Sequence, residues 1–419
     1  MRRVVVTGIG TINSTGHNVK DSFEAVVNGV CGIDTITLFD ASDFSVKIAG
    51  EVKDFDPTTV MDKKEVKKAD RFIQLGIKAA HEAMIDSGYV TADNKKVDGS
   101  IADRFGIISG SGIGGLSTIE RNSVVCETKG SRKVSPFFIP SSLANMLSGF
   151  ISIEHNLRGP SLAHVTACAA STHALNDAVK TIMIGGADRI LVVGAESAIC
   201  GAGVAGFAAM KALSTRNDDP KKSSRPFDID RDGFVMGEAA GALVVEDLEL
   251  ALARGAKIYA EIIGFGESGD ANHITSPVMD GPLRAMQAAF EMAKNITGEY
   301  PKIDYINAHG TSTPVGDKNE TAAIKALFGG KENAPLVSST KGQIGHCLGA
   351  AGAIEAIFTI KALNEGIIPP TINIENQDPE CDLDYVANVA RKLNLTTVMS
   401  NNFGFGGTNG SVIFRKYVK

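Results

Sequence analysis

Residues 161–187 read SLAHVTACAASTHALNDAVKTIMIGGA, and this stretch decides how the chain folds. Residues 162–165 tolerate a strand, and after Cys168 the chain turns into small residues that are typical of a helix. Apolar residues then recur at helical spacing until Gly185-Gly186 predicts the helix end. Cys168 is therefore expected in a first helical turn, where unpaired N–H groups and the helix dipole favour the thiolate. The alternative is a buried structural cysteine, since free cysteines are often buried.

The composition of the 419 residues is that of an α/β protein with a large core. Hydrophobic residues make up 43% and charged residues 21%, and 45 glycines predict many tight turns. The net charge of −6 argues against a general nucleic-acid binder. The six cysteines include no CxxC pair, which indicates neither a zinc ribbon nor a disulfide framework and suits a reducing compartment.

Targeting and membrane signals are not found in the sequence. Met1-Arg2-Arg3 leads directly into Val4-Val5-Val6, and no apolar run reaches the length of a membrane span. We therefore expect a cytoplasmic protein that binds neither membrane nor nucleic acid.

Strands and helices alternate in two successive runs. The first run has strands expected at residues 3–8, 105–109, 189–194 and 235–246. The second begins near residue 256, with strands at 257–264, 303–308, 335–339, 397–403 and 410–415 and helices at 282–294, 317–328 and 348–363. This alternation predicts right-handed βαβ units, mostly parallel sheets and helices on both faces. Two such runs suggest duplicated halves, residues 1–255 and 256–419.

Residues 110–115, GSGIGG, follow an expected strand and formally match the dinucleotide fingerprint GxGxxG. The usual acidic residue at the end of a following strand is missing, because Glu127 falls in the turn-like CETKGSRK. The other interpretation is a glycine loop that allows close backbone approach beside a pocket.

Residues 61–88 predict a long amphipathic helix or a helix pair. Its first half carries five cations that would share one face at i, i+4 spacing: Lys63, Lys64, Lys67, Lys68 and Arg71. Such a run is either a solvated face or a docking site for an anionic partner.

Four stretches combine a strand end, glycines and a reactive side chain. They contain Cys168, His309 in YINAHGTST, Lys341 and His346 in STKGQIGH, and the glycine loop 403–409. Because residues at the carboxyl ends of parallel strands line the functional crevice, these groups are expected to converge. Each also has a structural alternative: a turn histidine, a helix cap or a surface lysine.

Glu355 lies among small and apolar neighbours in GAAGAIEAIFTI, so we expect its carboxylate to be buried. A buried carboxylate needs a partner or must be neutral. Lys341 and His346 are the nearest candidates in sequence, and such a cluster tunes a proton-transfer site.

These motifs resemble those of the β-ketoacyl-[acyl-carrier-protein] synthases, condensing enzymes of fatty-acid synthesis. The resemblance runs from VVVTGIG to NGSVIF and includes TACAAS, AHGTSTPVGD, STKGQIGHCLGAAG and NNFGFGGTN. It implies an α/β thiolase-like fold with two duplicated βαβ halves in α-β-α-β-α layers. One cysteine with two histidines matches the chain-elongating branch, and GSGIGG and GFGFGG look most like type II.

The resemblance implies a decarboxylative Claisen condensation of an acyl thioester with malonyl-[acyl-carrier protein]. Cys168 would be the acyl-carrying nucleophile, and His309 and His346 would stabilise the malonyl enolate. Lys341 and Glu355 would support them, and the backbone N–H groups of Cys168 and Phe405 would hold an oxyanion. No metal and no cofactor are implied.

The resemblance also implies substrate and partner contacts. The expected substrate-binding residues are Ile113, Phe138, Thr311, Thr313 and Phe403, with Ile113 and Phe405 gating the acyl channel. The expected partners are acyl- and malonyl-[acyl-carrier protein], docked on Lys63, Lys64, Lys67, Lys68, Arg71, Lys129, Arg132 and Lys211. The chain is expected to be a homodimer.

Four alternatives remain open from the sequence. A polyketide ketosynthase uses the same Cys-His-His set. A degradative thiolase needs a second reactive cysteine, and Cys381 in DPECDLDY is unconvincing. A nucleotide-binding oxidoreductase built on GSGIGG leaves Cys168 and both histidines unexplained, and a chain-length factor would lack the nucleophile.

Overall fold

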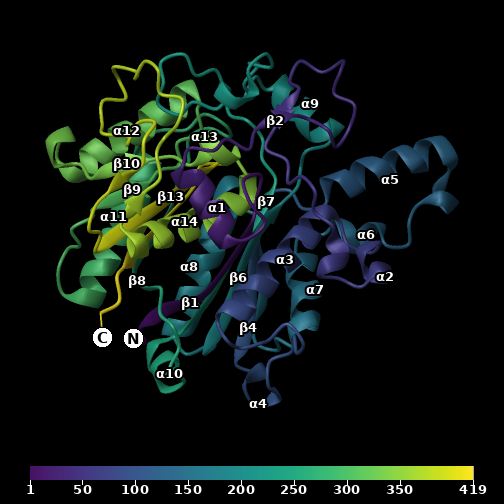
Figure 1. Cartoon of the computed structure of the whole chain (residues 1–419), viewed down its shortest axis with the longest axis horizontal. Coiled ribbons are helices and arrows are strands. Elements are labelled where there is room, and N and C mark those ends of the chain that lie inside the picture. The colour runs from purple at the N-terminus through teal and green to yellow at the C-terminus, as the bar shows by residue number, and fades with distance from the viewer. Residues whose placement is uncertain (419) are drawn as a thin grey trace.

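The computed structural model describes residues 1–418, within which ten strands form one sheet (Figure 1). Their order is β10-β9-β13-β14-β8-β1-β7-β6-β4-β5. The bounds are β1 Val4–Ile12, β4 Phe105–Gly110, β5 Ser161–His164, β6 Arg189–Glu196, β7 Ala239–Asp247, β8 Ala260–Gly269, β9 Tyr305–Asn307, β10 Leu336–Ser338, β13 Thr397–Gly404 and β14 Thr408–Arg415. Two small sheets pair β2 (Asp34–Thr35) with β3 (Ile48–Ala49) and β11 (Ile367–Ile368) with β12 (Arg391–Lys392).

Helices pack on the large sheet, which gives the α/β fold that the family resemblance implies. The longer helices are α1 Val19–Val27, α3 Arg71–Asp86, α5 Leu116–Lys129, α7 Met146–His155, α8 Ala170–Met183, α9 Gly201–Ala209, α11 Asp280–Thr297, α12 Pro314–Phe328 and α14 Ala351–Glu365. Helices α8 and α14 pack on each other and contact strands from both halves of the strand order. Helix α3 packs on β1, β7 and β6, and α11 packs on β8 and β14. The short helices are α2 Lys63–Val66, α4 Gly99–Ala102, α6 Phe138–Ser142, α10 Leu248–Ala253 and α13 Lys341–Ile344.

The two runs of strands form opposite halves of the strand order. Strands that precede residue 255 make up one half and later strands the other. The two halves meet where residues 4–6 of β1 pair with residues 260–262 of β8. The duplicated halves stay a prediction, which this strand order supports.

The expectation of mostly parallel pairing is wrong. Of the nine strand pairings in the sheet formed by residues 1–418, four are parallel and five antiparallel. Strands β13 and β14 show the physical reason, because the tight turn of 405–407 joins them directly. Only an antiparallel pair can be linked by so short a turn, whereas a parallel pair needs a crossover.

The predicted helical segment at 61–88 is a helix pair, α2 and α3. Asp62 accepts the N–H of Lys64, and Asp70 accepts the N–H of Phe72, so each helix has its own N-cap. The cations of this segment therefore do not share one helix face.

Cys168 lies in the turn between β5 and α8. It occupies a 3₁₀ turn, η3 (Ala167–Ala169), immediately before the helix. Ala167 has a φ of +49°, which is uncommon for a residue with a Cβ and is a form of strain often found at functional sites. This backbone turns Cys168 out of the strand and into the interior.

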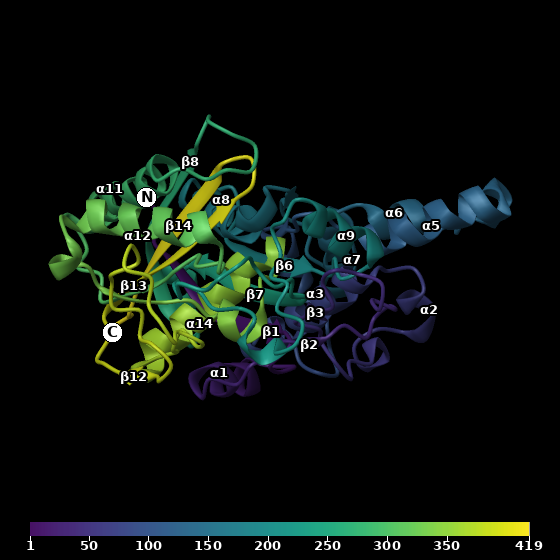
Figure 2. The same ribbon diagram turned by 90° about the horizontal axis from the view of Figure 1, so that it is seen from above.

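Figure 2 shows α5 reaching outward from the body of the molecule. Among the described residues, no helix combines the length and the apolar character that crossing a membrane requires.

The close packing of α8 against α14 can be tested by substitution. A Cβ at Gly352 would lie 2.1 Å from Thr172 Oγ1, so we expect Gly352→Ala to lower the free energy of unfolding by about 1–3 kcal/mol. Gly99→Ala is the matched control, because a Cβ there meets nothing within 4 Å. Denaturant unfolding followed by circular dichroism measures both; equal stability of the two variants would contradict the packing described.

Candidate active site

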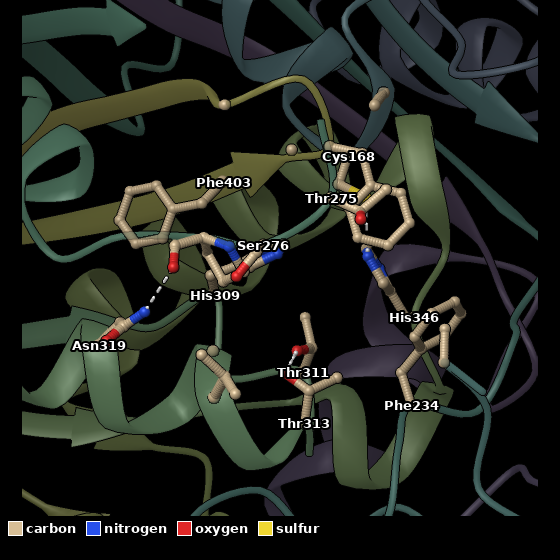
Figure 3. A pocket seen from close by; sticks show the side chains of 18 of the residues that line it. Cys168, Phe234, Thr275, Ser276, His309, Thr311, Thr313, Asn319, His346 and Phe403 are labelled. Atoms are coloured by element: carbon tan, nitrogen blue, oxygen red, sulfur yellow. Dashed lines mark hydrogen bonds between the residues drawn. The ribbon is translucent and has the colours of Figure 1, made fainter. Parts of the chain in front are cut away.

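A cavity of about 540 Å³ lies where the strand ends meet, and Cys168, His309 and His346 face it (Figure 3). Its apolar wall is formed by Ile113, Phe207, Phe234, Leu348, Phe403 and Phe405. Lys211, Thr311 and Thr313 also line it. The structure thus brings together most of the residues that the sequence singled out, from both halves of the chain.

Cys168 and His346 point toward each other. His346 Nε2 lies 3.0 Å from Cys168 Sγ, as the dashed line in Figure 3 marks. The backbone N–H of Leu348 points at His346 Nδ1, 3.3 Å away, so Nδ1 is the acceptor. A neutral imidazole with Nδ1 as acceptor carries its proton on Nε2. His346 therefore offers an N–H to the sulfur and to whatever binds beside it.

His309 completes a compact group of rings. Its ring centroid lies 5.3 Å from that of His346, with the two planes nearly perpendicular, and 5.7 Å from that of Phe403. The backbone N–H groups of His309 and Gly310 donate to the two carboxylate oxygens of Glu320 at 2.9 and 2.8 Å. Glu320 thereby fixes the turn that presents His309 to the cavity.

Both histidines are neutral in this environment. Burial lowers the pKa of His309 well below its usual value, and the charge of Lys341 lowers it further. The pKa of His346 is lowered for the same two reasons. Two neutral imidazoles can donate hydrogen bonds without acting as strong acids.

Lys341 forms a buried ion pair with Glu355 behind the histidines. Their side chains are 1% and 0% exposed, and Asn402 Nδ2 also donates to the carboxylate at 2.7 Å. Burial raises the pKa of Glu355, whereas the ammonium group and the amide lower it. Lys341 thus brings its ammonium charge close to both histidines, while the counter-charge lies on Glu355.

The expected lowering of the thiol pKa is wrong for the unliganded site. Burial raises the pKa of Cys168 to about 12. Lys341 and the backbone N–H groups of Phe405 and Cys168 oppose that rise, which means that both N–H groups face the sulfur. The cost of burying a charge exceeds the help of a helix start, so the resting group is a thiol.

The glycine loop 110–115 is not free to hold a nucleotide. The side chain of Glu196 accepts the N–H groups of Gly112, Ile113 and Gly114 at 2.5 to 3.2 Å. These are the donors that a pyrophosphate would need. The dinucleotide interpretation therefore fails, and the glycine loop beside a pocket is the correct one.

Several predicted contacts lie elsewhere. Phe138 begins α6, is half-buried, and is not among the described residues that line the cavity, so its predicted place in the substrate channel is not supported within this chain. Arg71 donates two hydrogen bonds to the buried Glu238, at 2.8 and 2.7 Å, which corrects its assignment to an open docking face. Lys68 is paired with Glu65. The other docking candidates, Lys63, Lys64, Lys67, Lys129, Arg132 and Lys211, are exposed.

Sequence reasoning missed Glu196, Phe207, Phe234, Glu320 and Leu348. Glu196 follows the predicted buried strand 189–194 and ends the observed β6, so the strand-end rule that selected His309 would also have selected it. The apolar residues of the cavity wall could not be found in this way, because an apolar side chain in a sequence indicates only a place in the hydrophobic core. No three His, Cys, Asp or Glu side chains within 1–418 are grouped to hold a metal ion.

Comparisons with known proteins agree on one family. Residues 1–251 match the family model of the beta-ketoacyl synthase N-terminal domain, and residues 259–375 match that of its C-terminal domain. The chain is 50% identical over 419 residues to 3-oxoacyl-[acyl-carrier-protein] synthase 2 of Vibrio harveyi, covering 99% of each chain.

Solved structures are similar along the full chain. A beta-ketoacyl synthase from Burkholderia phymatum is 36% identical, with a TM-score of 0.91 and full coverage of both chains. The type II polyketide ketosynthase AntDE, bound to hexaketide and in complex with its acyl-carrier protein AntF, is 29% identical with a TM-score of 0.86. That match covers 99% of this chain and 100% of the other.

The raised thiol pKa predicts how Cys168 responds to pH. Since only the thiolate is alkylated, the rate of iodoacetamide labelling at Cys168 should rise about tenfold per pH unit between about pH 7 and 10, below the folded pKa. Peptide mass spectrometry quantifies the label, and Cys168→Ala should abolish it at that peptide. A rate that levels off below about pH 8 would contradict a raised pKa.

Proposed function

This chain belongs to the beta-ketoacyl synthase family, and from that premise we propose how the residues around Cys168 carry out its reaction. The enzyme condenses an acyl thioester with malonyl-[acyl-carrier protein], giving 3-oxoacyl-[acyl-carrier protein], carbon dioxide and free carrier protein. This condensation elongates fatty acids. The observation that carries the residue assignments is the convergence of one thiol and two neutral imidazoles on one apolar cavity.

The first step is acyl transfer to Cys168. Its sulfur attacks the thioester carbonyl carbon, and the carrier's sulfur leaves as a thiolate that takes up the proton lost by the Cys168 thiol. The N–H groups of Cys168 and Phe405 face the sulfur, so they are suited to hold the oxyanion that forms beside it.

The second step is decarboxylation of the malonyl group. The thioester oxygen would accept hydrogen bonds from His346 Nε2–H and from His309 as the carbon dioxide leaves. Because burial and the charge of Lys341 lower the pKa of both rings and keep them neutral, they stabilise the enolate oxygen without protonating the new carbanion.

Carbon–carbon bond formation completes the cycle. The enolate carbon attacks the carbonyl of acyl-Cys168, the carbon–sulfur bond breaks, and the released Cys168 thiolate takes a proton from the solvent to return to the resting thiol. Glu355 contributes by holding Lys341, and Phe405 contributes its backbone N–H and a side chain on the cavity wall.

The cavity separates polar from apolar contacts. The hydroxyl groups of Thr311 and Thr313 lie 3.0 Å apart and are suited to bind the pantetheine arm of the carrier protein. Ile113 and Phe403 supply apolar surface for the acyl chain. The exposed lysines Lys63, Lys64 and Lys67 are proposed to dock the carrier protein, as a basic face suits an acidic partner.

The homodimer is proposed to form through β5. This strand ends the sheet of the described chain and pairs there only with β4. Leu162, Val165 and Ile153 expose 47%, 56% and 76% of their surface beside it. An open edge with apolar side chains is suited to pair with its copy about a two-fold axis.

The halves 1–255 and 256–419 are proposed to be related units, which the boundary between the two family models supports. Six free cysteines support a cytoplasmic location, where thiols stay reduced.

A polyketide ketosynthase is the second candidate, favoured by the similarity to AntDE. The higher identity to the fatty-acid enzyme favours elongation of fatty acids.

Acyl transfer is tested by mass spectrometry. Incubation with hexanoyl-[acyl-carrier protein] should add one acyl group to Cys168, and Cys168→Ala should add none, because the nucleophile is gone. Phe207→Leu, which alters the wall only, should still be acylated. Acylation at another residue would contradict the assignment.

Decarboxylation is tested with histidine variants. Substituting either His309 or His346 by Ala should lower carbon dioxide release from malonyl-[acyl-carrier protein] by about 10²–10³-fold, because one enolate donor is lost. Acylation of Cys168 should be less affected. Unimpaired release of carbon dioxide would refute the proposed role.

The dimer is tested by sedimentation. Leu162→Lys should convert the protein to a monomer, because it places a charge at the apolar edge. Val389→Lys is the matched control, since Val389 is 74% exposed and lies far from β5 in sequence. A monomeric wild type, or a dimeric Leu162→Lys protein, would contradict the β5 interface.

A further inference from the structure

Glu196 is a buried carboxylate that no step of the reaction uses. It ends β6 with 0% of its surface exposed. Oε2 accepts the N–H groups of Gly112 and Gly349 at 2.5 and 3.0 Å. Oε1 accepts the Ser111 hydroxyl at 3.0 Å and the N–H groups of Ile113 and Gly114, each at 3.2 Å. Burial raises the pKa of the Glu196 carboxyl, and the donors around both oxygens oppose that rise.

These donors come from two separate segments of the cavity wall. Gly112 and Ile113 belong to the glycine loop after β4, whereas Gly349 lies in the 3₁₀ turn η6 (Leu348–Ala350). Ile113 and Leu348 both line the cavity beside Cys168. One carboxylate therefore joins the two segments that carry these apolar wall residues.

The two segments are packed as closely as backbone allows. A Cβ at Gly349 would lie 2.1 Å from the nitrogen of Gly112, and a Cβ at Gly112 would lie 2.8 Å from Glu196 Oε2. Only glycine permits this approach. The two segments meet through backbone N–H groups, which are all donors and cannot bond one another. The Glu196 carboxylate holds the segments together because it accepts hydrogen bonds from both.

We propose that Glu196 is a positioning residue that fixes the acyl end of the cavity by clamping the loop of Ile113 to the turn of Leu348. It acts through these two side chains and does not touch the substrate. The group that this clamp helps to select is the acyl chain on Cys168, so this inference rests on the proposed function. Loss of the clamp should relax the discrimination between short and long acyl chains.

The charge of Glu196 gives a second readout. It raises the pKa of the Cys168 thiol, in addition to the effect of burial. Replacing the carboxylate by an amide removes that charge, so the thiol pKa falls and alkylation of Cys168 becomes faster at a given pH. A shorter carboxylate keeps the charge and only disturbs the clamp.

The test compares Glu196→Gln, Glu196→Asp and the control Glu246→Gln. Glu246 is also 0% exposed and is held by Arg254 and Thr7, but it lies outside the cavity lining of the described chain. Acylation of Cys168 by hexanoyl- and tetradecanoyl-[acyl-carrier protein] is measured for each folded variant. The pH profile of iodoacetamide labelling is measured without carrier protein.

Both Glu196 variants should change the ratio of tetradecanoyl to hexanoyl transfer by about tenfold. Glu196→Gln alone should shift the labelling profile to lower pH, and Glu246→Gln should change neither quantity. If Glu196→Gln does not fold, the changed ratio in Glu196→Asp still tests the clamp. Wild-type ratios and profiles in folded Glu196 variants would overturn the proposal. A shifted profile without acylation of any variant, wild type included, would instead refute the proposed function.

Discussion

The buried ion pair of Lys341 and Glu355 is the interaction on which the site depends. Taking two charges out of water costs several kcal/mol, so such a pair is weak evidence for stability. The effect of the pair on the pKa values of neighbouring groups is clearer. Burial lowers the pKa of His309 and His346, and the ammonium charge lowers it further. The same charge opposes the rise that burial causes in the pKa of the Cys168 thiol. One cation thus favours the neutral imidazoles that bind an enolate and the thiolate that attacks an acyl group.

Two packed helices, α8 and α14, place this charge close to the Cys168 thiol. Cys168 precedes α8 and Glu355 lies on α14, and these two helices pack against each other between the two sides of the sheet. Gly352 and Thr172 show how close that contact is. The two runs of the sequence meet here, because residues 1–255 supply Cys168, the proposed nucleophile, and residues 256–418 supply the two histidines and Lys341.

Strand-end reasoning predicted which reactive side chains meet in the cavity, because the change from a buried strand to a glycine-rich turn is visible in a sequence. It located Cys168, His309 and His346, and the apolar context of Glu355 predicted its burial. The thiol pKa could not be predicted, since desolvation depends on every neighbour and outweighed the helix start. Arg71 read as one more surface cation because its partner, Glu238, lies 167 residues away in sequence. Except for β13 with β14, the antiparallel pairings likewise join strands that are far apart in sequence.

Burial and the charge of Lys341 keep His309 and His346 neutral, and the proton of His346 lies on Nε2. Nitrogen NMR of the protein labelled with ¹⁵N-histidine measures both properties directly. We expect both rings to stay neutral as the pH falls below 6.5, the ordinary histidine pKa, and the His346 Nε2 resonance to be that of a protonated nitrogen. An imidazolium signal from either ring near pH 7, or a proton on Nδ1 of His346, would contradict it.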